Sequence, residues 1–296
     1  MIYTVTLNPA LDCHLREGEE LHQGQFAPGG KGVNVSRVLT TLGMDNRALG
    51  FIAGDKGRLL ERILTDMGVA TDFIPLPEGE TRVNMKFCGP VEIERNGVGA
   101  PVPAEALARL IEQLDMLVTA EDTVCLCGSL PPGVPADVYG RLVCHLRQRG
   151  VSRIVVDTSG AALTAALPYG PWLIKPNQDE LAVAVGRELP TTTDVMAAAE
   201  ELRGLGAHNV LVSLGGAGAV LCTADGLRLH REAPPVQVMG TVGAGDSMVA
   251  GFVREYLLTE DWEAALRAGL ICGSSTASAE GLCTAADVAK VAENTQ

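Results

Sequence analysis

The sequence is poor in aromatic residues and contains no run of basic residues, no Cys-x-x-Cys pair and no Gly-x-Gly-x-x-Gly fingerprint. Phe, Trp and Tyr make up only 4% of the chain, so a core has to be built from smaller apolar side chains. The formal net charge is −13. Because nucleic acids and anionic membranes are bound by basic surfaces, we expect neither as a partner. An anionic small molecule can still be a ligand if its site is locally positive.

The cysteines lack the spacing of metal ligands or of a disulfide framework. There are eight of them, at positions 13, 88, 125, 127, 144, 222, 272 and 283. We interpret them as buried, reduced thiols that pack as small hydrophobic groups. Cys125 and Cys127 alternate in an apolar run, so we expect both on one face of a strand.

No uncharged apolar segment has the length that crosses a bilayer. The first residues predict a strand, Ile2–Leu7, and lack the basic and apolar regions of a signal peptide. We therefore expect a cytoplasmic protein.

Strand-like apolar runs alternate with helical patterns along most of the chain. The predicted strands are Ile2–Leu7, Ala48–Ala53, Thr123–Cys127, Arg153–Asp157, Trp172–Ile174, Val210–Ser213 and Ala219–Cys222. The predicted helices are Val33–Leu42, Lys56–Met67, Pro103–Leu117, Pro135–Arg149, Gln178–Val185 and Asp194–Leu205, and the chain is largely helical from Ala244 onward. This alternation predicts an α/β fold with a mostly parallel sheet flanked by helices.

Two segments interrupt the alternation. Residues 11–28 are polar and irregular. Residues 82–99 predict two short strands, Arg82–Phe87 and Val91–Arg95, joined by a turn at 88–90. We expect the two segments to pair as a small β-sheet lid inserted in a single domain that spans residues 1–296.

A glycine-rich turn, Thr241-Val242-Gly243-Ala244-Gly245-Asp246-Ser247, leads into a helical pattern. Such a turn exposes unpaired backbone N–H groups at the positive end of a helix dipole, which is an anion site. An acidic residue there opposes anion binding, unless Asp246 removes a proton from a hydroxyl while the N–H groups hold a phosphoryl group. The alternative is an Asp that merely favours a helix N-terminus.

A second glycine loop, Gly29-Gly30-Lys31-Gly32-Val33-Asn34, also leads into a helix. Lys31 adds a positive charge, and Asn34 can donate and accept hydrogen bonds to polyol oxygens. The loop is not a P-loop, since Gly32 follows Lys31 where Ser or Thr is required. A plain surface turn is the alternative.

Two further segments follow predicted strands. In Lys175-Pro176-Asn177 with Glu180, the last two polar side chains can share a helix face and orient water around Mg²⁺. They can equally form a capping box. The turn Ser213-Leu214-Gly215-Gly216-Ala217-Gly218 can accept a nucleotide or be a plain hairpin.

In this order and spacing, the four segments resemble the ribokinase-like (PfkB) family of carbohydrate kinases over essentially the whole chain. Gly128-Ser129-Leu130-Pro131 adds to the resemblance. It implies a three-layer α/β fold with a β-sheet lid, a homodimer formed through the lids, and ATP and Mg²⁺ as cosubstrates.

The resemblance also implies roles for single residues. Asp246 would be the general base, beside an anion hole formed by Gly243, Ala244 and Gly245. Sugar contacts would come from Asp12, Gly29, Gly30, Lys31, Asn34 and Ser129. Nucleotide contacts would come from Lys175, Asn177, Ser213, Gly215 and Gly218. Glu180 and Asp157 would act in the metal shell through water.

Within the family, the opening Thr6-Leu7-Asn8-Pro9-Ala10-Leu11-Asp12 resembles 1-phosphofructokinases and tagatose-6-phosphate kinases. Thr81-Arg82-Val83-Asn84-Met85-Lys86 resembles the former more closely. Arg82 and Lys86 are an even number of residues apart in a predicted strand, so both face one side and can grip a sugar's phosphate. Two solvated lid charges are the alternative.

The resemblance therefore implies phosphorylation of D-fructose 1-phosphate to the 1,6-bisphosphate. A tagatose-6-phosphate kinase or a 6-phosphofructokinase of the same family is the first alternative. A non-catalytic sugar-phosphate sensor on the same fold is an alternative from another class, and the intact Asp246 loop speaks against it.

Overall fold

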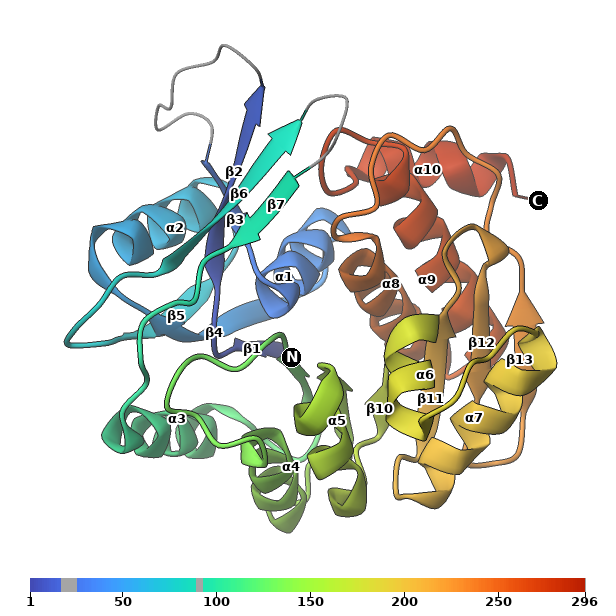
Figure 1. Ribbon diagram of the computed structural model, residues 1–296, viewed down its shortest axis with the longest axis horizontal. Coiled ribbons are helices and arrows are strands. Elements are labelled where there is room, and N and C mark those ends of the chain that lie inside the picture. The colour runs from blue at the N-terminus through green and yellow to red at the C-terminus, as the bar shows by residue number, and fades with distance from the viewer. Residues whose placement is uncertain (17–25, 89–92, 296) are drawn as a thin grey trace.

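The computed structural model describes residues 1–16, 26–88 and 93–295. Its main feature is a large twisted sheet covered by helices, with a smaller sheet standing beyond one edge of it (Figure 1). Along the large sheet the strands are β5 (Thr71–Pro75), β4 (Asn46–Ile52), β1 (Ile2–Thr6), β8 (Thr123–Cys127), β9 (Arg153–Asp157), β10 (Leu173–Ile174), β11 (Asn209–Ser213), β12 (Ala219–Cys222) and β13 (Arg228–Arg231).

The strand order reverses at β1, and this reversal places the site. In this spatial order the strands from β5 through β1 to β11 run parallel. At the other edge, β12 is antiparallel to β11, and β13 is antiparallel to β12. From β1 the chain builds outward through β4 and β5, then returns to β8 on the other side of β1. Parallel sheets bind ligands outside the carboxyl ends of the strands at such a point.

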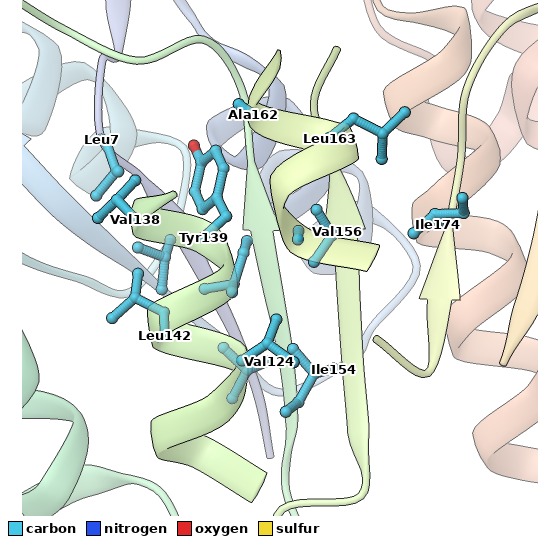
Figure 2. Packing of buried hydrophobic residues seen from close by; sticks show 14 of the residues in the cluster. Leu7, Val124, Val138, Tyr139, Leu142, Ile154, Val156, Ala162, Leu163 and Ile174 are labelled. Atoms are coloured by element: carbon cyan, nitrogen blue, oxygen red, sulfur yellow. The ribbon is translucent and has the colours of Figure 1, made fainter. Parts of the chain in front are cut away.

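One face of the sheet is covered by five helices of the middle of the chain. They are α3 (Ala104–Leu117), α4 (Val138–Gln148), α5 (Gly160–Ala166), α6 (Gln178–Val185) and α7 (Thr192–Gly204). Figure 2 shows Tyr139 of α4 beside Leu7 and Val138, whereas Val124 and Ile154 of the sheet lie further along the strands. The ring of Tyr139 is fully buried, and its hydroxyl donates to the carbonyl groups of Cys127 and Gly128 at 2.9 and 3.0 Å. The core thereby fixes the turn that follows β8.

The other face is covered by α1 (Lys31–Thr41), α8 (Ala244–Thr259) and α9 (Trp262–Ala277), with α10 (Ala285–Glu293) packed on α9. Helix α2 (Gly54–Asp66) packs between the β4–β5 edge and the small sheet. Cys125 and Cys127 are buried together on the α1–α8 face, which confirms their predicted shared face. The cysteines whose side chains are described are free, and they are buried as predicted except for Cys144, which is half-buried.

The small sheet has the order β3 (Phe26–Gly29), β2 (Ala10–Arg16), β6 (Arg82–Cys88) and β7 (Ile93–Asn96). The prediction that residues 11–28 are irregular is therefore wrong where β2 and β3 lie. The segment Leu11-Asp12-Cys13-His14-Leu15-Arg16 does alternate apolar and polar residues, but its charges hid the period. The predicted turn at Gly89 and Pro90 lies outside the described residues.

The predicted strands of the large sheet and the predicted helices are all present, with ends shifted by a few residues at most. The sequence did not predict β5, β13 or α5. Strand β13, Arg-Leu-His-Arg, is a mostly exposed edge strand without an apolar face. Among the described residues, every helix is too short or too polar to cross a membrane.

Candidate active site

The predicted site residues gather at the carboxyl ends of β1, β8, β9 and β10, where α1 and α8 begin (Figure 1). Helices α1 and α8 pack against each other, so the two glycine loops that precede them lie side by side. The loops are far apart in the sequence. Their meeting is what a shared site for two substrates requires.

Asp246 lies in the first turn of α8. Gly243 caps this helix in a left-handed conformation, with φ 80°, which favours glycine. A side chain there would also meet Leu282, since a Cβ would lie 2.4 Å from its Cδ2. First-turn amides such as those of Gly245 and Asp246 have no intrahelical acceptor, so they can receive an anion.

The Asp246 carboxylate is 7% exposed and is held by Asn34 of α1. Asn34 Nδ2 donates to Asp246 Oδ2 at 2.8 Å. Burial raises the pKa of Asp246 to about 6, and Asp157 adds to the rise, while the bond from Asn34 and the charges of Lys31 and Lys175 oppose it. A carboxyl group with a pKa just below neutrality is ionised at pH 7 and can still take up a proton, as a general base must.

Lys31, Asp157, Lys175 and Glu180 form a charge cluster beside Asp246. Lys31 Nζ lies 2.8 Å from Asp157 Oδ1 and 3.8 Å from Glu180 Oε1. Lys175 Nζ lies 3.6 Å from the same Asp157 oxygen. Burial alone would lower the pKa of Lys31, but the two carboxylates outweigh it and the pKa is raised. The cluster thus sets two ammonium groups against the carboxylates of Asp157 and Glu180, beside Asp246.

Lys175 also lies over the glycine-rich turn that leads into α8. A Cβ built on Gly245 would be 3.2 Å from Lys175 Nζ, so the ammonium group faces the start of α8. Lys175 is 3% exposed. An ammonium group beside free amides strengthens an anion site at this helix terminus.

The sequence left open whether Asn177 and Glu180 form a capping box, and in the structure they do. Asn177 Oδ1 accepts from the Glu180 amide at 2.7 Å, and Glu180 Oε2 accepts from the Asn177 amide at 2.9 Å. The pair thereby begins α6. Capping uses one carboxylate oxygen of Glu180 and leaves the other facing Lys31.

The turn with Ser213, Gly215 and Gly218 joins β11 to the antiparallel β12, so the hairpin interpretation holds for its backbone. Ser213 pairs with Asn177 in an isolated bridge, which brings the turn next to the start of α6. A Cβ on Gly218 would lie 1.8 Å from the Arg231 carbonyl oxygen. Packing alone therefore requires glycine at this position.

On the small-sheet side, Asp12 lies against the second glycine loop. A Cβ on Gly29 would be 2.6 Å from Asp12 Cγ, and Asn84 Nδ2 donates to Asp12 Oδ1 at 2.7 Å. Gly30 caps α1. Ser129 is exposed and follows Gly128, next to the start of α1.

Arg82 begins β6 and is half-buried. Its Nε donates to the Asn8 carbonyl at 3.1 Å, and its Nη1 lies 3.5 Å from the Gly97 carbonyl. Both carbonyls belong to connections between the two sheets. Lys86 lies in the same strand, but its side chain is outside the described part of the chain.

The chain matches the description "pfkB family carbohydrate kinase" over residues 3–289. It belongs to the pfkB family of carbohydrate kinases. It is therefore a sugar kinase, a phosphotransferase, as the resemblance of the motifs implied.

Relatives of this pfkB kinase span its whole length. The 1-phosphofructokinase of Bacillus subtilis (strain 168) is 36% identical over 291 residues, which cover 96% of this chain and 95% of the relative. Phosphofructokinase-2 of Escherichia coli, solved in complex with potassium, is 33% identical with a TM-score of 0.89 and covers 100% and 99% of the two chains. Arabidopsis thaliana ribokinase, with a TM-score of 0.78 at 19% identity over 98% and 97%, shares the fold. The predicted ribokinase-like fold is confirmed.

Sequence reasoning about this pfkB kinase missed Arg37 and Asn84. Arg37 donates to the Pro28 carbonyl and approaches Asn34 Oδ1. Asn84 bonds Asp12 from the paired position on β6. Arg37 follows Asn34 by three residues in a helical pattern, and this spacing could have placed it on the same face.

Proposed function

We propose that this kinase transfers the γ-phosphoryl group of ATP to the 6-hydroxyl of D-fructose 1-phosphate. The sugar oxygen forms a bond to the γ-phosphorus as the bond from that phosphorus to the β,γ-bridging oxygen breaks. ADP leaves, and the hydroxyl proton passes to Asp246. The products are D-fructose 1,6-bisphosphate and ADP.

The observation that carries the proposal is the buried Asp246 carboxylate at an amide-rich helix terminus. Asn34 occupies Oδ2, so Oδ1 is the oxygen that accepts the proton. The first-turn amides of α8 and the ammonium group of Lys175 lie at the same helix start as Asp246 and would stabilise the charge of the transferring phosphoryl group. A base and an anion hole on one turn suit phosphoryl transfer to a hydroxyl.

ATP would lie along the α6 and β11 side, near Lys175, Asn177, Ser213, Gly215 and Gly218. Mg²⁺ is the metal that nucleotide phosphates usually carry, and it usually keeps several waters. The residues fit this: Asp157 Oδ2 is buried with no hydrogen-bond partner in the described part of the chain. We assign Asp157 and Glu180 to hold the waters of the ion. When bound, Mg²⁺ would neutralise charge on the phosphates.

The choice of sugar rests on the small sheet and on the relatives. Arg82 and Lys86 would bind the phosphate already on the sugar, and Asp12, Gly29, Gly30, Lys31, Asn34 and Ser129 would surround the ring and the reacting hydroxyl. Relatives at 36% and 37% identity are named 1-phosphofructokinase. Phosphorylation of fructose 6-phosphate is the second candidate, because the E. coli phosphofructokinase-2 structure with that sugar has a TM-score of 0.88.

The test is ADP release from Mg-ATP by the purified protein, with kcat/KM compared for fructose 1-phosphate, fructose 6-phosphate and tagatose 6-phosphate. We expect a clear preference for fructose 1-phosphate. Preference for a 6-phosphate would overturn the choice of sugar and keep Asp246 as the base. No turnover with any of the three would favour a sugar-phosphate sensor.

Two expectations about this protein stay predictions. One is a homodimer formed through the small sheets; the E. coli phosphofructokinase-2 has been solved as a tetrameric inhibited form. Sedimentation would establish the assembly of this chain. The other is its cytoplasmic location.

A further inference from the structure

Arg37 of α1 reaches from the helix to two parts of the site. It is half-buried. Its Nη1 donates to the Pro28 carbonyl at 2.7 Å and lies 3.4 Å from Asn34 Oδ1. Pro28 immediately precedes the Gly29-Gly30 loop, and Asn34 holds the Asp246 carboxylate. One guanidinium nitrogen therefore contacts both the residue that precedes the Gly29-Gly30 loop and Asn34, which donates to Asp246.

The chemistry of an amide makes this contact directional. A guanidinium nitrogen can only donate, and Nη1 carries two hydrogens, one for each of these acceptors. An amide has an accepting oxygen at one end and a donating nitrogen at the other. With its oxygen toward Arg37, Asn34 must present its nitrogen to Asp246. In the reverse orientation, the amide nitrogen of Asn34 would face the donor of Arg37, and the amide oxygen would face the acceptor oxygen of Asp246.

We propose that Arg37 is a positioning residue, which acts through Asn34 to hold the Asp246 carboxylate in the geometry needed to accept the hydroxyl proton. Asp246 Oδ2 is then occupied and Oδ1 faces the reacting group. Without Arg37 the amide is free to turn, and the carboxylate loses its fixed donor. The proposal rests on Asp246 being the base.

The charge of Arg37 could act on the site in another way. Asp12 is the carboxylate that interacts with it electrostatically. An effect through Asp12, or through the Pro28 carbonyl, would change how the sugar binds and would not depend on Asn34. Dependence on Asn34 therefore separates the proposal from these routes.

The test is a double-mutant cycle on the full-length protein with Arg37→Met, Asn34→Ala and the double variant, measured as kcat at saturating Mg-ATP and sugar phosphate. We expect Arg37→Met alone to lower kcat by about tenfold, the scale of one hydrogen bond to a charged group. In the Asn34→Ala background the same change should alter kcat by less than about twofold. Arg37→Lys, which keeps a donor, should recover part of the loss.

Arg203→Met is the matched control. Arg203 is also half-buried, and it also donates to a backbone carbonyl, that of His208, and to a side chain three residues away on its helix, Glu200. It should lower stability and leave kcat unchanged. Equal losses of kcat from Arg37→Met in both backgrounds, or no loss in the wild-type background, would overturn the proposal. Normal kcat in Asp246→Asn would instead remove the base on which it rests.

Discussion

The two sides of the candidate active site are built differently. Around Asp246, the residues Asn34, Asp157 and Lys175 are all at most 7% exposed. Asn34 donates to Asp246, and Asp157 pairs with both Lys31 and Lys175. On the small-sheet side, Arg82 is half-buried and donates to backbone carbonyls of the connections between the sheets. The chemistry is thus fixed within the large sheet and its helices, whereas the choice of sugar depends on residues of the small sheet.

Of all the changes to either side of the site, replacement of Asp246 should lower activity most. Asp246→Asn keeps the shape and can still accept the hydrogen bond from Asn34, but it cannot take a proton. We expect kcat to fall about 10²–10⁴-fold, the usual contribution of a general base, with little change in either KM. Steady-state kinetics with both substrates measures this, and a kcat within tenfold of wild type would count against Asp246 as the base.

Lys31→Met should have the next largest effect, because it leaves Asp157 with Lys175 alone. Breaking a fully buried ion pair costs about 3–5 kcal/mol, and since Lys31 is 31% exposed and Lys175 remains, we expect about 1–3 kcal/mol of lost stability. The kcat should also fall, because Lys31 helps to keep Asp246 ionised. Denaturant unfolding and kinetics measure the two effects.

Lys56→Met is the control for that change. Lys56 pairs with Glu80 at 3.8 Å, and both side chains are nearly half exposed. A pair of this kind contributes less than about 1 kcal/mol. Equal losses of stability from the two lysine variants would contradict the view that the cluster around Asp157 is special.

A substitution on the small-sheet side should weaken binding of the sugar phosphate. Arg82→Ala should raise KM for the sugar phosphate about 10–100-fold, the range for lost hydrogen bonds to a charged group. KM for ATP should not change. Arg95→Ala, an exposed arginine of β7, is the control. An unchanged sugar-phosphate KM would assign Arg82 to joining the two sheets only.

The last predicted effect is a gain of stability, whereas most substitutions of buried residues reduce stability. Because burial raises the pKa of Asp246 from 3.8 to about 6, the folded state binds the proton more tightly than the unfolded state. Stability therefore falls as pH rises between these values and stays reduced above them. Asp246→Asn removes this penalty, so we expect a gain of about 1–3 kcal/mol at pH 8. Urea unfolding should show the gain at pH 8 and its loss near pH 4; an equal difference at both would contradict the pKa shift.

The same comparison explains what the sequence could predict. The glycine loops and Asp246 stood out as local motifs, and the apolar strands of the large sheet were readable because both faces are buried. Strands β2 and β3 were not predicted, since the charges of β2 obscured its alternation. The burial that raises the pKa of Asp246, and its hydrogen bond from Asn34, depend on packing between distant segments that no local pattern shows.

The most direct test of Asp246 as a buried base is the pH dependence of kcat/KM in the wild type and in Asn34→Ala. In the wild type, kcat/KM should fall as pH drops through about 6, because protonation removes the base. Substrate phosphates also titrate near this pH. The bond from Asn34 lowers the pKa of Asp246, so its loss should move this limb to higher pH, whereas a limb due to substrate would stay in place. A shifted limb would support the account, and an identical limb in both proteins would contradict it.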